Sequence, residues 1–354
     1  MILSENCWRS ADEPFFRLTG FAFRKEKGVF RRFEENIPLP PGVYSNAWHT
    51  PGGMLQFMTD SPFIRLKFSA WHVSHLSVNT LIAASGFDLY MGKPGKKQYF
   101  CGVTRMKAGE TEYCVDLIEN LTPGVMREFT LHFPLYGGVE RLEIGLAENA
   151  VNLPPSPWAD DRPVVFYGTS IIHGGCANRP GMALTNLLSR RFNRPFLNFG
   201  FSGTGKGEPE VFEQLARVEN PALYILDYGP NVTSEGMKAT LGKGIEILRK
   251  VHKSVPILVV GKFHFMQEYL ETFSLTRRGE DVQKMIDFQK EEVRRRRRRG
   301  DKNIFFLPGD WGKLPDWTEF TIDGVHPTDL GFYMHARFMG KCFEKFLTTK
   351  ECCK

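Results

Sequence analysis

Long apolar runs are absent from this chain of 354 residues. No stretch of about 18 uninterrupted apolar residues occurs, so the sequence predicts no helix that spans a membrane. The first ten residues carry Glu5 and Arg9 and lack the basic segment, apolar stretch and small-residue cleavage site of a secretory signal. We therefore expect a cytoplasmic protein, or a bacterial periplasmic or secreted protein whose signal has been removed.

Cysteine pairs with metal-binding or redox spacing are also lacking. The seven cysteines include no Cys-x-x-Cys pair, which favours reduced thiols in a chain of this size. His173 and Cys176 stand three residues apart, but no second close pair completes a metal site. The sequence accordingly predicts neither a metal nor any other cofactor.

A general excess of positive charge is missing too. The 46 lysines and arginines exceed the 40 acidic residues by six, and residues 294–299 alone are six consecutive arginines. This run ends a helix-like segment before Gly300, where cations interact favourably with the negative end of the helix dipole. We expect a solvated helix end and no nucleic-acid partner, with a polyanion-binding patch as the alternative.

Hydrophobic residues make up 42% of the sequence and charged residues 24%, as in globular proteins, and the length favours two domains.

The first half of the chain has the pattern of β structure. Up to about residue 155, apolar and polar residues alternate with the period of two that a half-buried strand requires. The alternation is clearest at residues 64–68, 129–133 and 142–146, and turn signals such as Pro51-Gly52-Gly53 separate these runs. We expect a jelly-roll-like antiparallel β-sandwich without a long helix.

The second half has a different period. Residues 152–157 contain three prolines and read as a linker, so we place one domain at 1–155 and a second at 160–350. Beyond the linker, short apolar runs alternate with longer amphipathic segments; the runs lie at 164–166, 195–199, 222–226, 257–260 and 304–307. This pattern predicts a parallel sheet covered by helices, in which ligands bind at the carboxyl ends of the strands.

Four segments that follow predicted strands carry residues suited to catalysis. The first contains Ser170, where a strand-to-helix turn exposes a hydroxyl to backbone N–H donors; a plain helix N-cap is the alternative. The second contains Gly203 in a glycine-rich stretch, where the backbone can approach a developing negative charge. The third contains Asn231, whose amide could donate to an oxyanion, although asparagine is also common in turns.

The glycine-rich stretch also tests a nucleotide-binding hypothesis. Residues 200–206 fit the first seven positions of the phosphate loop G-x-x-x-x-G-K-[ST]. The eighth position is Gly207, which has no hydroxyl for magnesium, and Glu208 and Glu210 would repel phosphate at the following helix start. We therefore favour a tight turn over a nucleotide site.

The fourth segment places Asp323 three residues before His326, at the entrance of an amphipathic helix. That spacing lets the carboxylate orient one ring nitrogen while the other faces a serine hydroxyl. A capping aspartate beside a structural histidine is the alternative.

Together the segments occur in the order serine, glycine, asparagine and Asp-x-x-His, which resembles the SGNH (GDSL-like) hydrolases. The resemblance implies that Ser170 is the nucleophile and that Asp323 and His326 complete its triad. It also implies an oxyanion hole formed by Ser170, Gly203 and Asn231. It covers about residues 162–348 and implies a flavodoxin-like three-layer α/β/α domain, with Gly-Thr-Ser-Ile in place of Gly-Asp-Ser-Leu and Gly-Pro-Asn without a following aspartate.

The sequence Gly86-Phe87-Asp88-Leu89-Tyr90 matches the Gly-x-Asp-Leu-Tyr signature of the branch that carries an N-terminal β domain. This arrangement is similar to two-domain carbohydrate esterases, and it implies a serine esterase that acts on a small acyl, above all acetyl, ester of a carbohydrate. We expect His173 to line the acyl pocket and His264 to lie along the substrate path. An acyltransferase and a non-catalytic carbohydrate-binding protein are the alternatives. The expected partner is a small-molecule or oligosaccharide ester, and the oligomeric state is left open.

Overall fold

The computed structural model describes residues 6–74, 76–263, 265–268, 277–309 and 317–348, which form two compact units. The sandwich unit consists of Met1–Glu35, Ala47–Asp161 and Ala177–Pro195, and the α/β unit consists of Asn36–Asn46, Arg162–Cys176 and Phe196–Lys354. The compact units therefore interleave along the chain, whereas the sequence places a single boundary in the proline-rich linker.

The sandwich unit contains two antiparallel sheets. The first has the order β1-β9-β4-β7, with β1 (Asn6–Ser10), β9 (Arg141–Ala147), β4 (Ile64–Ser69) and β7 (Glu112–Ile118). The second has the order β10-β3-β8-β5-β6, with β10 (Asn152–Leu153), β3 (Met54–Thr59), β8 (Arg127–His132), β5 (Asp88–Met91) and β6 (Tyr99–Val103), and β2 (Arg17–Thr19) pairs with β3. The alternation in the sequence thus predicted the sandwich correctly.

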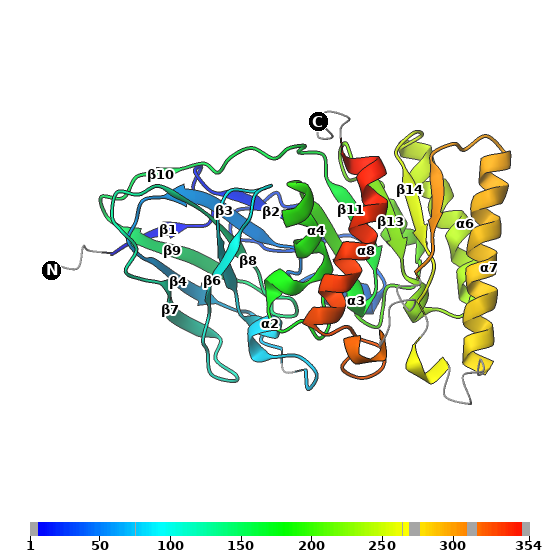
Figure 1. Ribbon diagram of the computed structural model, residues 1–354, viewed down its shortest axis with the longest axis horizontal. Coiled ribbons are helices and arrows are strands. Elements are labelled where there is room, and N and C mark those ends of the chain that lie inside the picture. Colours follow the sequence, from blue (N-terminus) through cyan, green and yellow to red (C-terminus); the bar gives the residue numbers. More distant parts are fainter. Residues whose placement is uncertain (1–5, 75, 264, 269–276, 310–316, 349–354) are drawn as a thin grey trace. The chain divides into compact units, whose positions relative to one another are not determined.

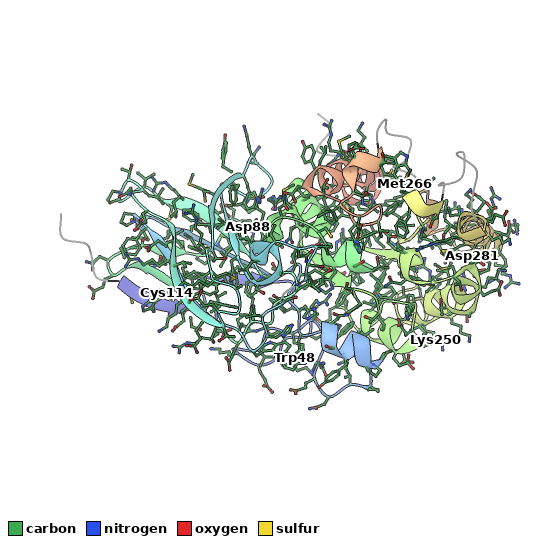
Figure 2. The ribbon with its side chains drawn as sticks, turned by 90° about the horizontal axis from the view of Figure 1, so that it is seen from below. Trp48, Asp88, Cys114, Lys250, Met266 and Asp281 are labelled. Atoms are coloured by element: carbon green, nitrogen blue, oxygen red, sulfur yellow. The ribbon has the colours of Figure 1, made fainter. Side chains whose placement is uncertain are left out.

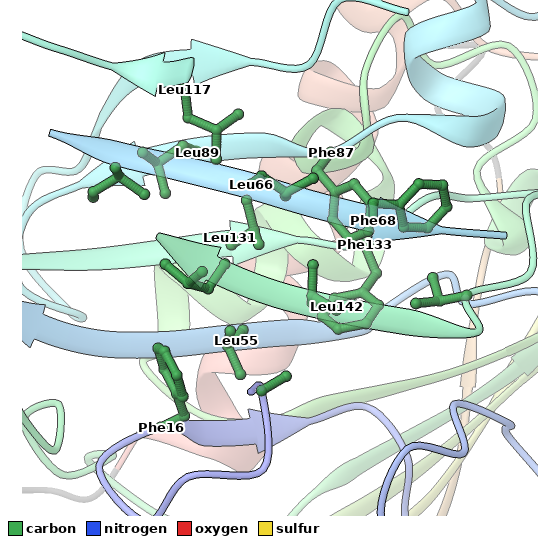
Figure 3. Packing of buried hydrophobic residues seen from close by; sticks show 14 of the residues in the cluster. Phe16, Leu55, Leu66, Phe68, Phe87, Leu89, Leu117, Leu131, Phe133 and Leu142 are labelled. Atoms are coloured by element: carbon green, nitrogen blue, oxygen red, sulfur yellow. The ribbon is translucent and has the colours of Figure 1, made fainter. Parts of the chain in front are cut away.

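The core of this unit lies between the inward faces of both sheets. Leu66 in β4 and Leu131 in β8 are fully buried, whereas Lys67 is exposed, as the period of two requires. Figure 3 shows Leu66, Leu131 and Leu55 of β3 packed among aromatic rings of the same core. Each such leucine contributes about 2 kcal/mol through burial.

Three short helices complete the unit, α2 (Leu81–Ser85), the 3-10 turn η1 (Pro180–Met182) and α4 (Leu184–Phe192). Although α4 follows the linker in sequence, it belongs to the sandwich unit. Arg190 in α4 lies 3.0 Å from His132 in β8, between Nη1 and Nε2. Such contacts explain why the segment from 177 to 195 packs with the sandwich.

The α/β unit is built on a parallel sheet with the order β12-β11-β13-β14-β15. Its strands are β12 (Phe196–Gly200), β11 (Val164–Gly168), β13 (Leu223–Asp227), β14 (Ile257–Val260) and β15 (Ile304–Leu307). This is the flavodoxin-like order, 2-1-3-4-5. Every residue of β11, β12 and β13 is buried, as expected for strands covered on both faces.

Helices cover both faces of this sheet. Figure 1 shows α8 (Asp329–Leu347) on one face and α6 (Ser234–Val251) with α7 (Arg277–Arg298) on the other. The shorter elements of the unit are α1 (Pro41–Asn46), α3 (Ser170–His173), α5 (Pro209–Leu215) and the 3-10 turns η2 (Gly229–Asn231), η3 (Met266–Glu268) and η5 (Trp317–Phe320). The expected three-layer α/β/α arrangement is confirmed.

The arginine run forms the carboxyl end of α7. Arg295 and Arg296 both pair with Glu292, at 2.7 and 2.6 Å, and Arg297 donates to two backbone carbonyls beyond the helix. Arg294 and Arg298 pair with Glu291, so the side chains of five of the six arginines have partners within the described part of the chain. Among the described helices, none is both long and apolar enough to cross a membrane.

Candidate active site

Ser170 begins a one-turn helix directly after strand β11. Thr169, the N-cap, has an extended backbone, and Gly174 ends the turn with a φ of 105°. Glycine adopts a left-handed backbone conformation at little cost, because it has no Cβ. The chain can therefore reverse after only four helical residues. The serine therefore stands at the carboxyl end of a buried strand, at a sharp strand-to-helix turn.

The turn before α8 holds Asp323 and His326 together. The Oδ1 atom of Asp323 accepts hydrogen bonds from the backbone N–H groups of Val325 (3.0 Å) and His326 (2.7 Å). Gly324 has a φ of 81°, which this tight reversal requires, and its N–H donates to Thr321 Oγ1 at 3.1 Å. The carboxylate is thus oriented by its own turn.

Three side chains form a continuous hydrogen-bonded chain. His326 Nε2 lies 2.8 Å from Ser170 Oγ, and His326 Nδ1 lies 2.7 Å from Asp323 Oδ2. Burial raises the pKa of Asp323, but the hydrogen bonds from His326 and Val325 and the nearby imidazole outweigh burial and hold the pKa below its ordinary value of 3.8. The carboxylate is therefore ionised at neutral pH, and it can orient the ring and stabilise an imidazolium.

Gly203 lies in the turn after strand β12, with a φ of 70° and open space where a Cβ would stand. Its N–H makes no hydrogen bond to a described residue, so it can donate to a ligand. The neighbouring backbone is fixed by Asn46 of α1, whose Nδ2 donates to Ser202 O (3.1 Å) and Thr204 Oγ1 (3.0 Å). Sequence reasoning missed Asn46, because an isolated asparagine far from the motifs carries no signal.

Asn231 lies close to the same turn, in η2. Its Nδ2 donates to the carbonyls of Phe201 (3.4 Å) and Gly205 (3.2 Å). These contacts tie the loop after β13 to the loop after β12, and both distances are long for N–H···O bonds. The amide is therefore engaged with protein, and its donation to an oxyanion stays a prediction.

Two further histidines, His173 and His264, are predicted substrate-binding residues. His173 is fully buried, and its Nδ1 accepts the N–H of Ser202 at 3.4 Å. The ring therefore contacts the backbone next to Gly203, and its place in the acyl pocket stays a prediction. His264 lies outside the described residues.

The loop after β14 supports the turn that carries Asp323 and His326. The sequence motifs did not predict this contact. Met266 N donates to Gly324 O at 3.2 Å. The loop is held by an ion pair of 2.5 Å between Lys262 Nζ and Glu268 Oε1, both side chains being nearly inaccessible. Burial lowers the pKa of Lys262 to about 8, although Glu268 opposes the shift.

Asp227, the last residue of β13, stands beside Gly168 in the sheet. Its side chain is buried, and burial raises its pKa to about 7. A carboxyl of this kind carries its charge at a cost to stability. Among the described residues, no group of three His, Cys, Asp or Glu side chains is arranged to hold a metal ion.

Comparison with known proteins identifies the family models that the two parts of the chain match. The family model of GDSL-like lipases and acylhydrolases matches residues 161–344, and the model of the N-terminus of SGNH-hydrolase-type esterases, named after Gly-x-Asp-Leu-Tyr, matches residues 7–151. No curated protein matches the chain significantly.

Several solved structures are similar to this chain over most of its length. A protein from Bacteroides ovatus, described as a GDSL-like lipase, is 30% identical, with a TM-score of 0.86 over 97% of this chain and 98% of its own. The salicylyl-acyltransferase SsfX3 from a tetracycline biosynthetic pathway is 18% identical, with a TM-score of 0.75 over 97% of this chain and 99% of its own. A family two carbohydrate esterase from Clostridium thermocellum, in complex with cellohexaose, is 13% identical, with a TM-score of 0.56 over 83% of this chain and 92% of its own.

The last two structures share the fold alone at these identities, whereas the family model spans more than half of the chain. The chain belongs to the GDSL-like lipase/acylhydrolase family of SGNH hydrolases.

Proposed function

We propose that the protein is a serine esterase in which Ser170 attacks an acyl ester, His326 is the general base and Asp323 orients the imidazole. The observation that carries this proposal is the pair of hydrogen bonds, 2.8 Å from Ser170 to His326 and 2.7 Å from His326 to Asp323. The distances suit proton transfer from the hydroxyl to the ring without further movement.

In this mechanism, His326 Nε2 takes the proton as Ser170 Oγ bonds to the ester carbonyl carbon. The carbonyl oxygen becomes an oxyanion, which the N–H groups of Ser170 and Gly203 stabilise, with Asn231 as a third donor if its amide turns from the carbonyls it contacts. The tetrahedral intermediate collapses when His326 protonates the leaving alcohol. Water then attacks the acyl-enzyme with His326 again as base, and the acid is released.

The substrate we propose is a small acyl ester, with acetyl as the first choice, on a carbohydrate. Support comes from the fold that the chain shares with an esterase solved in complex with cellohexaose, together with the sandwich unit that precedes the α/β unit. The same acyl-enzyme would perform acyl transfer if an alcohol displaced water, and the fold is also that of a salicylyl-acyltransferase. Chemistry at Ser170 is common to both reactions.

The test is release of p-nitrophenol from p-nitrophenyl acetate by the full chain and by Ser170→Ala. We expect loss of at least about 1,000-fold in kcat for the variant, because no other group takes the place of the nucleophile. The exposed Ser77 provides a matched Ser→Ala control, which should retain the full rate. Equal rates for wild type and Ser170→Ala would disprove the esterase mechanism. A series of acyl chain lengths and acetylated oligosaccharides then identifies the substrate, and added alcohol reveals any acyl transfer.

A further inference from the structure

The Gly-x-Asp-Leu-Tyr signature holds one arginine of the sandwich unit. Asp88, at the start of β5 and labelled in Figure 2, is fully buried, and its Oδ2 atom accepts Nη1 of Arg179 and the N–H of Gly181, each at 2.8 Å. Nη1 of Arg179 also donates to the hydroxyl of Tyr90. Both polar residues of the signature therefore bind the same guanidinium nitrogen.

The backbone around this arginine is fixed as well. A Cβ on Gly181 would lie 2.5 Å from the Tyr90 ring and 2.7 Å from Asp88 Oδ2, so the chain approaches the signature as closely as glycine permits. Nη2 of Arg190 donates to Gly181 O at 2.7 Å, and its guanidinium carbon lies 4.1 Å from the centre of the Tyr90 ring. Arg179 is thus held in place before any ligand binds, which reduces the entropy that binding would cost.

The cluster carries more positive than negative charge. The guanidiniums of Arg179 and Arg190 face one carboxylate, that of Asp88. Burial lowers the pKa of His132 well below its ordinary value, and the two arginines lower it further, so this ring is neutral and accepts from Arg190. Burial raises the pKa of Asp88, against the opposing effect of Arg179. An anion at the open side of the cluster would balance the excess charge.

That open side exists at Arg179. Its side chain is 22% exposed, and all its protein hydrogen bonds within the described part of the chain involve Nη1. Nε and Nη2 therefore remain as the two-pronged donor edge that matches a carboxylate, on the side away from Asp88. The guanidinium lies 4.2 Å from the ring centre of Phe100, which is 46% exposed on strand β6.

We propose that Arg179 is a binding residue for a carboxylate attached to a six-membered ring, oriented by the signature residues Asp88 and Tyr90. The Nε and Nη2 edge binds the two carboxylate oxygens, and the exposed face of Phe100 packs against the ring. Aromatic acids and sugar acids share this chemistry. The site belongs wholly to the sandwich unit, so it goes beyond the proposed esterase function and does not depend on it.

Equilibrium binding to the full chain tests the site, with titration calorimetry on two acids and their neutral counterparts. Benzoate is paired with benzamide, and glucuronate with methyl glucoside. We expect saturable binding of at least one acid and at least about tenfold weaker binding of its neutral counterpart, because the amide or glucoside cannot accept both donors. The acid that binds distinguishes the aromatic source from the sugar source.

Three variants separate recognition from folding. Arg179→Lys keeps the charge and the ion pair to Asp88 but loses the two-pronged donor edge of Nε and Nη2. We expect about tenfold weaker binding of the acid and an unchanged melting temperature. Arg141→Lys, a 61% exposed arginine on β9 in the other sheet of the same unit, is the matched control and should bind as wild type. In Asp88→Asn the amide oxygen can take the place of Oδ2 and accept the hydrogen bonds from Arg179 and Gly181. The donor edge of Arg179 then stays oriented, and the acid should bind at least as tightly as it binds to wild type.

The proposal fails if neither acid binds saturably, if neutral and acidic members of a pair bind equally, or if Arg179→Lys binds as wild type does. Weaker binding by a stably folded Asp88→Asn would contradict the role given to the signature.

Discussion

Replacing Asp323 with asparagine is a sharp test of the triad, because the turn itself dictates how the new amide lies. In the structure, Oδ1 accepts the backbone N–H groups of Val325 and His326, while Oδ2 faces His326 Nδ1. An asparagine keeps its oxygen at the two backbone donors, so its NH2 group faces Nδ1 and donates to it. His326 then carries its proton on Nε2, which faces Ser170 and can no longer accept the hydroxyl proton.

The size of the effect follows from the bonds that a productive arrangement would break. Turning the amide to restore the correct tautomer loses two backbone hydrogen bonds, each about 1 kcal/mol, and sets the NH2 group against two donors. The total is about 3 kcal/mol, which lowers kcat on the order of a hundredfold. Stability should hardly change, because the favoured amide orientation preserves both backbone bonds.

The assay is steady-state hydrolysis of p-nitrophenyl acetate together with thermal unfolding. Asp287→Asn serves as the control, since Asp287 is exposed on α7, and it should leave kcat unchanged. A decrease in kcat of less than about threefold for a folded Asp323→Asn would refute the assignment of Asp323 as the residue that orients the imidazole.

Three further predictions concern stability. Burial raises the pKa of Asp227 from 3.8 to about 7, so the folded state holds a proton that the unfolded chain releases, and stability should fall as the pH rises through this window. Asp227→Asn should remove that fall and raise the melting temperature at pH 8 in calorimetry; an unchanged slope would contradict it. Gly205→Ala places a Cβ 2.4 Å from a carbonyl of β11 and should cost at least about 3 kcal/mol in urea unfolding, whereas Gly203→Ala meets open space and should cost about 1–2 kcal/mol from its positive φ. Equal costs would count against this packing. Arg297→Ala should lower the free energy of unfolding by about 1–2 kcal/mol, because it removes two hydrogen bonds to backbone carbonyls. The side chain of Arg294 is 67% exposed, so Arg294→Ala should change the free energy of unfolding by no more than about 0.5 kcal/mol. A larger loss for Arg294→Ala than for Arg297→Ala would contradict these contacts.

Local patterns were sufficient to predict most of the fold. The alternation at residues 64–68 became β4 (Ile64–Ser69), and the apolar run at 257–260 became β14 (Ile257–Val260), because period and burial are local properties of a strand. The interleaving of the two units was not predictable in this way. The segment 36–46 packs with the α/β unit and 177–195 with the sandwich unit, and such packing depends on surfaces that a single sequence does not encode in its periodicity.

In the site, too, some features were predictable from the sequence and others were not. Ser170, Asp323 and His326 were chosen by motif, and the structure brings their side chains within hydrogen-bond distance. Motifs do not encode which way a side chain turns, so the engagement of Asn231 with two carbonyls and the burial of His173 could not be foreseen. Both depend on side-chain rotamers within a packed loop.

Trapping the covalent intermediate tests nucleophilic catalysis by Ser170 most directly. The full chain is treated with a phosphonate ester that reacts as an acyl group does, and the adduct is located by intact mass and peptide mass spectrometry. We predict one adduct, on the peptide that contains Ser170, with activity lost in proportion and no adduct on Ser170→Ala. An adduct on another residue that abolishes activity, or full ester hydrolysis by Ser170→Ala, would contradict the account.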